Sequence, residues 1–363
     1  MHAYVRSMTS YARQVKGQLD FRQVPRKRAC MAVTSRDVAR LAGVSQPTVS
    51  RALRDDPRVS EDTKRRVRES AALIGYVPSE AGRALSSGHT RRIGLLVTDL
   101  DNQFYAHIIA PVHQELERLG YQLMLHTESV DNETVAERLI SNGLDGVILA
   151  TTTVDSVAPL RLRDRGLPFI YFNRTASFVP ADATTAAPTA GFVAAATAVR
   201  DLGHTRIGAV LGPSNTSTAQ AREIALRAAL ADCGLRLEQD YVRRGPFNTV
   251  SGDEATTSLL NLQRPPTVIF CGNDVVAYGA LNAARRGGVI VPDDLSVIGF
   301  DNLPAADWPI IELSTIAYDL VGMARAAAGL IVGRIENPGS EVSHVEFETA
   351  FIQRGTLAAP MSR

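Results

Sequence analysis

The feature that most constrains the fold is an alternation of short apolar runs with longer amphipathic stretches, which begins after Arg92. The apolar runs are bounded by polar residues or glycine and comprise residues 93–98, 121–126, 146–150, 169–172, 206–211, 267–271 and 296–300. Near-continuous apolar strands that alternate with helices are typical of parallel sheets covered on both faces. The pattern therefore predicts an α/β body of two doubly wound parallel-sheet lobes, with a ligand crevice at the carboxyl ends of the strands.

Polar side chains follow several of these runs, as a ligand crevice requires. Asn173 and Arg174 come after the fourth run, Asn273 and Asp274 after the sixth, and Asp301 after the seventh. Fixed carboxylate, amide and guanidinium groups can pair with the hydroxyl groups of a polyol. Any single Asp or Asn at such a position could instead cap the following helix. Because these residues recur in both halves of the body, the pattern favours a binding site.

Upstream of the body, the chain predicts a small helical head. Val38, Leu41 and Ala42 fall on one helical stripe, and Gly43 provides a stop and a tight turn. The first helix of the head is therefore expected to bury these three side chains.

Two further helices complete the head. One is predicted over Gln46–Leu53 with Ser45 as its cap, and another over Glu61–Ile74 with Val67 and Leu73 on its buried side. Two short helices joined by a glycine-containing turn and closed by a third form the helix-turn-helix arrangement.

The outward residues of the second helix have the chemistry of a major-groove reader. Gln46 can pair with adenine, and Arg51 can pair with guanine or phosphate. Ser45, Thr48 and Ser50 are short donors to phosphate oxygens. The alternative is a plain turn between two surface helices.

Charge is distributed unevenly along the 363 residues, although the net charge is only +1. Residues 1–30 carry seven Lys/Arg against one Asp, residues 31–92 carry twelve against seven, and the other 271 carry twenty against thirty. A basic head on an acidic body predicts that the head meets a polyanion and the body does not.

Several protein classes are excluded by what the sequence lacks. The longest apolar run, Ala190–Val199, is about half of the roughly 20 residues needed to cross a bilayer. The first thirty residues lack the apolar region of a secretory signal, so we expect a cytoplasmic protein without membrane contact. Cys30, Cys233 and Cys271 provide neither a disulfide framework nor a CxxC metal knuckle. GxSxG, HExxH, P-loop and GxGxxG motifs are absent, so no enzyme is predicted.

The runs DVARLAGVSQPTVSRAL, RVSEDTKRRV and LIGYVPSEAGRAL resemble the DNA-binding head and hinge helix of the LacI-type family of bacterial transcription regulators. The resemblance implies that Gln46–Leu53 is the recognition helix and that Leu85 wedges into the minor groove. Pro47 departs from the family pattern, because a base-reading side chain is often found there, and Gly82 stands where the hinge helix usually has alanine. The expected DNA contacts are Thr34, Ser45, Gln46, Pro47, Thr48, Ser50, Arg51, Tyr76 and Leu85.

The run CGNDVVAYGALNAARRGGVIVPDDLSVIGFDN resembles the effector domain of the same family, which is of periplasmic-binding-protein type. The segment LGHTRIGAVLGP and the helix around Arg222 also match, although Ala225 replaces a glycine that is common there. The implied effector contacts are Asn173, Arg222, Asn273 and Asp301, with Phe104 and Trp308 as aromatic walls and Arg174 and Asp274 as candidates that could instead cap a helix or bridge the lobes.

The expected domain division follows from these matches. Residues 1–30 are expected to be a disordered basic arm or to precede a biological start at Met31, with an extra helix as the alternative. The expected domains are a helix-turn-helix domain over 31–78, a hinge helix and linker over 79–91, and an effector-binding and dimerisation domain over 92–363. Its first lobe is expected to cover about 92–176 and 319–335, and its second about 177–318 and 343–357.

The resemblance implies a homodimeric repressor of a near-palindromic double-stranded DNA operator, controlled by a carbohydrate effector and needing no cofactor or metal. Two alternatives stay open: an effector that is a nucleobase or a phosphorylated metabolite, and a sugar-binding protein without a DNA function.

Overall fold

The computed structural model describes residues 33–77, 88–98, 100–127 and 133–361. The chain divides into two compact units, Met1–Ser86 and Ser87–Arg363, and each is described by itself. The predicted N-terminal extension, most of the predicted hinge segment over 79–91, and Leu85 lie outside the described residues.

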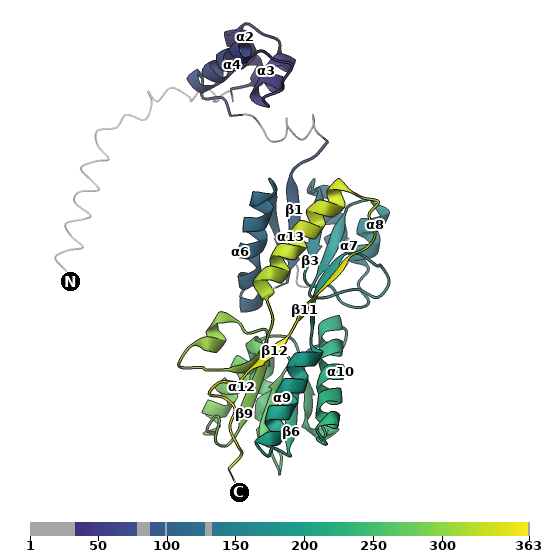
Figure 1. Ribbon diagram of the computed structural model, residues 1–363, viewed down its shortest axis with the longest axis vertical. Coiled ribbons are helices and arrows are strands. Elements are labelled where there is room, and N and C mark those ends of the chain that lie inside the picture. Colours follow the sequence, from purple (N-terminus) through teal and green to yellow (C-terminus); the bar gives the residue numbers. More distant parts are fainter. Residues whose placement is uncertain (1–32, 78–87, 99, 128–132, 362–363) are drawn as a thin grey trace, which may run out of the picture. The chain divides into compact units, whose positions relative to one another are not determined.

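The described part of the first unit is a three-helix head (Figure 1). Its helices are α2 (Ser35–Ala42), α3 (Gln46–Leu53) and α4 (Glu61–Leu73). The predicted bounds of α3 are confirmed, and those of α4 are confirmed except that Ile74 is its C-cap. Gly43 ends α2 with a φ of 65°, a left-handed conformation that glycine adopts without steric cost.

The core of the head is made of small and β-branched side chains. Val38, Val49 and Val67 are fully buried at the contact of the three helices. The prediction was wrong for Leu41 and Leu73, whose exposed fractions are 48% and 78%. In α2 the buried stripe runs through Val38, Ala39 and Ala42, which turns Leu41 to its edge because successive residues are rotated by about 100°.

The second unit consists of two α/β lobes, and the predicted fold class is confirmed. In the first lobe, all six strands are parallel and lie in the order β11-β5-β4-β3-β1-β2. Its elements are β1 (Arg92–Val97), α6 (Gln103–Arg118), β2 (Gln122–Thr127), α7 (Glu133–Ser141), β3 (Gly146–Leu149), α8 (Ala158–Asp164), β4 (Phe169–Phe172), β5 (Ala183–Ala187), α13 (Leu320–Glu336) and β11 (His344–Glu348).

In the second lobe the strand order is β12-β10-β9-β8-β6-β7, and only β12 is antiparallel to its neighbour. Its elements are α9 (Thr189–Asp201), β6 (Ile207–Leu211), α10 (Ser217–Asp232), η2 (Gln239–Tyr241), β7 (Val242–Arg244), α11 (Thr249–Leu260), β8 (Val268–Cys271), α12 (Asp274–Arg286), β9 (Ser296–Phe300), η3 (Pro304–Asp307), β10 (Ser314–Ala317) and β12 (Ala350–Ile352).

Helices cover both faces of each sheet (Figure 1). In the first lobe, α6 and α13 bury one face and α7 and α8 the other. In the second lobe, α9 and α10 cover one face and α11 and α12 the other. Both sheets reverse their strand order beside the first strand of the lobe, and such a switch point is where doubly wound folds bind ligands.

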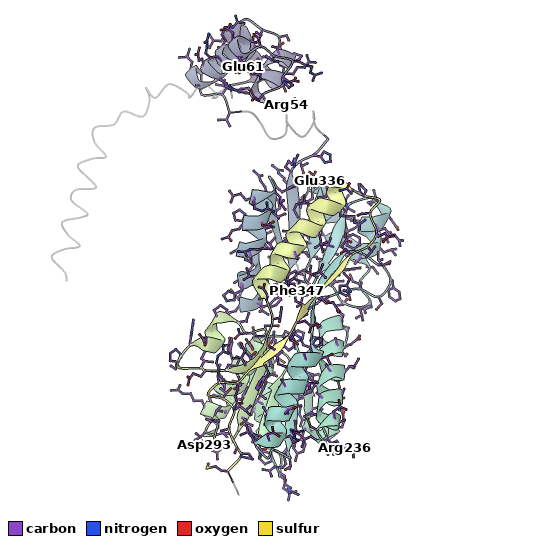
Figure 2. The ribbon with its side chains drawn as sticks, in the orientation of Figure 1. Arg54, Glu61, Arg236, Asp293, Glu336 and Phe347 are labelled. Atoms are coloured by element: carbon purple, nitrogen blue, oxygen red, sulfur yellow. The ribbon has the colours of Figure 1, made fainter. Side chains whose placement is uncertain are left out.

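The expected lobe boundaries need correction at two places. β5 pairs with β4, so the chain stays in the first lobe until about residue 187 and does not leave it near 176. β11 pairs in parallel with β5, so residues 344–348 also belong to the first lobe, and only β12 lies in the second. Figure 2 places Phe347 on β11, close to where this strand crosses toward the second lobe. The run pattern did not predict these pairings because β5 has no apolar run, and β11 pairs with it from a distant part of the sequence.

Candidate nucleic-acid interface and effector cleft

Helix α3 is positioned by its N-terminal cap. The Oγ of Ser45 accepts from the backbone N–H of Thr48 at 3.3 Å and lies 2.8 Å from the Oγ1 of Thr48. These two predicted phosphate donors are therefore engaged with each other in the free head. Gln46 and Pro47 form the exposed first turn of the helix, where proline needs no hydrogen-bond partner.

Gln46 is held by α2 rather than left free. Its Nε2 donates to the Oγ of Ser35 at 2.9 Å, and its Oε1 accepts from the Nε of Arg36 at 3.5 Å. Both amide atoms that would pair with adenine are thus engaged, so base reading by Gln46 requires it to exchange these partners.

Several arginines of the head form no salt bridge. Arg36, Arg51 and Arg54, on and around α3, have none among the described residues, and neither has Arg66 of α4; Arg54 donates to the Oγ of Ser50 at 2.5 Å. Figure 2 shows Arg54 just after α3 and Glu61 at the start of α4. Several basic residues elsewhere in the head are paired: Arg40 with Asp37, Arg58 with Asp56, Lys64 with Glu61 and Asp55, Arg65 with Asp62, and Arg68 with Asp55. Arginines without a salt bridge are the chemistry that a phosphate backbone attracts.

The remaining predicted DNA contacts have structural roles in the head. Thr34 is the N-cap of α2, and its backbone N–H donates to Asp37 at 3.1 Å. Tyr76 is half-buried and packs against the core of the head. Neither role prevents a contact to DNA through the exposed atoms.

The polar cluster of the second unit is built on a buried ion pair. Arg222, from α10, donates through Nη2 to Oδ1 of Asp301 at 2.9 Å and through Nη1 to the carbonyl of Gly272 at 2.7 Å. Its guanidinium carbon lies 3.7 Å from the ring centroid of Phe300, a cation–π distance. The hydroxyl of Tyr318 donates to the same carboxylate at 3.2 Å.

Burial and charge act in opposite directions on Asp301. Desolvation raises the pKa of this carboxyl, and the neighbouring Arg222 guanidinium partly offsets the rise. The backbone of Asp301 has a φ of 110°, which costs free energy for a non-glycine residue. Such strain is common at ligand sites.

Asn173 contributes an unsatisfied acceptor. It follows β4 with a φ of 65°, a left-handed conformation that asparagine tolerates better than most residues. Its side chain is only 8% exposed, and its Oδ1 has no hydrogen-bond partner among the described residues. An unpaired buried acceptor costs about 1–3 kcal/mol. A ligand that donates to this atom would recover that free energy.

Asn273 and Asp274 were each expected to contact a ligand or to cap a helix, and both make capping or bracing contacts. The Oδ1 of Asn273 caps α12 by accepting from the N–H of Val276 at 3.0 Å, although the residue also lines a cavity. Asp274 is fully buried and accepts from the Oγ1 of Thr315 at 2.5 Å and the N–H of Leu303 at 2.7 Å. Burial raises the pKa of Asp274 to about 8.

Two cavities lie between the lobes. The smaller, of about 20 Å³, is lined by Asn102, Phe104, Tyr105, Asn173, Arg174, Thr218, Arg222, Phe247, Asn273 and Asp301. The larger, of about 320 Å³, is lined by Leu96, Thr98, Asn102, Tyr105, Val135, Thr151, Thr153, Arg174, Pro213, Asn215, Thr216, Pro246, Phe247 and Asn248. The structure therefore gathers six of the eight predicted effector residues around the smaller cavity.

Asp274 and Trp308 are the two that it does not place there. Asp274 lies behind the site, and Trp308 follows η3 with a 55% exposed side chain that is outside the described lining of both cavities.

Phe247, which the sequence analysis did not single out, lines both cavities with an aromatic ring. The Arg174 guanidinium carbon lies 5.4 Å from its ring centroid, and Asn102 donates through Nδ2 to its backbone carbonyl at 2.9 Å. A Cβ on Gly212 would lie only 2.0 Å from the Cζ of the ring, so the glycine allows the ring to sit against the strand end. The one local signal for Phe247 was an aromatic residue in a Gly-Pro-Phe-Asn loop after a strand too short to be predicted.

Hydrogen bonds join the lobes around the cavities. Besides the bond between Asn102 and Phe247, the N–H of Val154 donates to the carbonyl of Asn215, and the N–H of Thr175 donates to the Oγ of Ser217, both at 2.9 Å. Most of these groups lie on loops, and Ser217 is the first residue of α10.

The described residues contain no cluster of three or more His, Cys, Asp or Glu side chains able to hold a metal ion. Among the same residues, no helix combines the length and the apolar character needed to span a bilayer.

Comparison with known proteins finds a family match in each of the two units. Residues 34–79 match the family described as "Bacterial regulatory proteins, lacI family", and residues 196–357 match the "Periplasmic binding protein-like domain". The HTH-type transcriptional repressor CytR of Escherichia coli (strain K12) is 33% identical over 311 residues, which cover 84% of this chain and 90% of that protein.

Two solved structures are similar in fold. A complex of the transcriptional regulator CelR with cellobiose is 27% identical, with a TM-score of 0.69 over 90% of this chain and 100% of that one. A lac repressor dimer bound to operator and the anti-inducer ONPF shares the fold, with 23% identity and a TM-score of 0.81 over 90% of this chain and 99% of that one.

Proposed function

Because the chain belongs to the LacI family of bacterial regulatory proteins, we propose that a small molecule bound between its two lobes controls how tightly its head holds a near-palindromic DNA operator. The chain is a DNA-binding transcriptional regulator of the repressor type, as its relatives are.

The assignment of the effector site rests on one observation. The Oδ1 of Asn173 is buried without a hydrogen-bond partner among the described residues, and Asn173 lines the same cavity as Arg222 and Asp301, which form a buried ion pair. A folded protein keeps such an acceptor unpaired only at a free-energy cost, and donation from a ligand hydroxyl or amino group removes that cost. Because the cavity residues come from both lobes, a bound ligand favours one lobe arrangement over others.

We assign a carbohydrate as the effector class. Asp301, Arg222 and Asn173 offer acceptors and donors fixed in space, which suits the vicinal hydroxyl groups of a sugar. Phe104 and Phe247 supply aromatic faces for the C–H surface of the ring. The CelR structure, whose protein binds cellobiose, is consistent with this class.

A phosphorylated metabolite is the second candidate. It is favoured by Arg174, which lines both cavities and forms no salt bridge among the described residues. A guanidinium of this kind can bind a phosphate through two parallel hydrogen bonds.

The proposed switch requires two chains. A homodimer in the cytoplasm presents two heads to two half-sites, and the effector shifts the population of lobe arrangements that allows both heads to bind. Coupling of this kind is typically about 1–3 kcal/mol, which changes operator affinity by roughly 5–150-fold.

Selection of binding sites from a random pool of DNA duplexes tests the proposal. The full-length protein is expected to enrich a near-palindromic sequence and to bind it at least about 10³-fold more tightly than random duplex at fixed salt. Addition of members of a sugar and phosphosugar panel is then expected to change that affinity for at least one compound. Equal binding to selected and random duplexes would contradict the assignment of the head.

A further inference from the structure

The first turn of α3 is in contact with an arginine of the neighbouring helix α2. We propose that this residue, Arg36, reads a guanine of the operator, and that Gln46 holds the Arg36 guanidinium in place instead of reading adenine itself. The inference rests on the proposed function, because it names a base contact through which the head recognises its operator.

The side-chain amide of Gln46 bridges two residues at the start of α2. Its Oε1 accepts from the Nε of Arg36 at 3.5 Å, and its Nε2 donates to the Oγ of Ser35 at 2.9 Å. Chemistry fixes this orientation of the amide, because a guanidinium has donors and no acceptor and must therefore face the amide oxygen. Both amide groups that would pair with adenine thus bind α2 instead.

The Arg36 guanidinium keeps most of its hydrogen-bonding capacity. Only its Nε has an acceptor among the described residues, so both Nη atoms are available. The side chain is exposed and forms no salt bridge with a described residue, since Asp37, the acidic residue of α2, pairs with Arg40 and caps Thr34. Two adjacent N–H donors in one plane match the O6 and N7 acceptors of guanine.

The position of Arg36 favours a base over a phosphate. In helix-turn-helix proteins, the N-terminal residues of the recognition helix contact base edges. Arg36 is bonded to Gln46, the first residue of α3, so its guanidinium lies at that end of the helix. Pro47, the next residue, has neither a side-chain donor nor a backbone N–H to offer a base. The donors for this part of the groove therefore come from Arg36.

The base preferences of full-length variants test the inference. Fluorescence anisotropy at fixed salt compares the selected operator with duplexes in which each base pair of both half-sites is replaced in turn. Arg36→Ala is expected to weaken binding to the selected operator by at least about fivefold, and to lose discrimination at one G·C pair of each half-site. Arg40→Ala is the matched control, because Arg40 is an exposed arginine of the same helix that is paired with Asp37. It is expected to keep the preference at every base pair.

A second variant, Gln46→Met, tests the positioning role of Gln46. Methionine has a similar length and lacks both hydrogen-bonding groups of the amide, so it releases Arg36. Gln46→Met is expected to reduce discrimination at the same G·C pair as Arg36→Ala. The double variant is expected to lose little more than Arg36→Ala alone, because both substitutions act on one contact. Ser35→Ala, which removes the other partner of the amide, repeats the test if Gln46→Met folds poorly.

The inference is overturned if Arg36→Ala weakens binding equally for all duplexes and reduces the slope of log K against log salt by about 0.9, as loss of a phosphate contact does. It is also overturned if Gln46→Met relaxes the preference at an A·T pair that Arg36→Ala leaves unaffected, because Gln46 then reads adenine itself. An operator preference that Arg36→Ala leaves intact rejects this inference alone. Failure of the proposed function gives a different result, since the unmodified protein then prefers no duplex over random sequence, which rejects both proposals.

Discussion

The guanidinium of Arg222 and the carboxylate of Asp301 lie 2.9 Å apart in the second lobe, and both side chains are almost fully buried. Removing one partner of a buried ion pair usually costs about 3–5 kcal/mol, because the other charge is left uncompensated. The two partners differ in how they can respond to the loss of the other. A carboxylate can take up a proton, whereas a guanidinium stays charged in a protein.

We therefore expect Asp301→Asn to lower the free energy of unfolding more than Arg222→Met at pH 6, because burial already raises the pKa of Asp301 and favours its neutral form. Urea denaturation at pH 6 and pH 8 measures both variants. Arg222→Met is expected to lose stability as the pH rises, since the unpaired carboxyl must then ionise. Equal stability losses at both pH values would contradict this account. Both variants are expected to lose the effector response while retaining operator binding.

Arg51 is expected to carry direct readout by α3, because it is exposed on that helix without a carboxylate partner among the described residues. Arg51→Ala should cost about 1–3 kcal/mol of operator binding at fixed salt. Arg68→Ala is the matched control, since Arg68 is an arginine of the same head that pairs with Asp55 at 2.7 Å. Fluorescence anisotropy with the selected duplex measures both. Equal losses for the two variants would contradict the assignment of α3.

Gly212 makes room for the ring of Phe247, so Gly212→Ala should displace that ring. We expect a loss of about 1–3 kcal/mol in the free energy of unfolding, as for other overpacked sites, and at least fivefold weaker effector binding. Gly329→Ala on α13 is the control, because a Cβ there meets nothing within 4 Å and alanine favours the helix. Calorimetry of both variants measures their stability and their effector binding. Unchanged effector binding by Gly212→Ala would contradict a role for the Phe247 ring.

Asp274 should make stability depend on pH. Burial raises its pKa from 3.8 to about 8, so between these values the folded state holds a proton that the unfolded state releases. The contribution of this group therefore decreases as the pH rises from about 4 to about 8, by at most about 1.4 kcal/mol per pH unit. Asp274→Asn cannot ionise and can still accept from the Leu303 N–H and donate to Thr315. Its unfolding midpoint in urea is expected to fall less between pH 5 and pH 8 than that of the unmodified protein, and parallel slopes would refute the assignment.

Local signals in the sequence were enough for the head and for most of the sheets. Ser45 and Ser60 mark the starts of α3 and α4 because a hydroxyl can satisfy the free N–H groups of a first helical turn. The seven apolar runs all became strands. Six of these strands are buried, and a strand buried on both faces must be apolar along its length, whereas β2 is apolar in part but exposed or half-buried. β5 was missed because its sequence, Ala-Thr-Thr-Ala-Ala, has no such run, and its place between β4 and β11 depends on residues far away in the chain.

The features of the binding site likewise depend partly on the sequence alone and partly on the tertiary structure. Which residues follow each strand was set by the sequence, and the family resemblance was sufficient to select Asn173, Arg222 and Asp301 from it. Only the tertiary structure decided that Phe247 and not Trp308 lies at the cavities, and that Gln46 is held by Ser35 and Arg36. The physical reason is that caps and apolar runs depend on neighbours a few residues away, whereas a ligand cavity depends on loops that two separate lobes bring together.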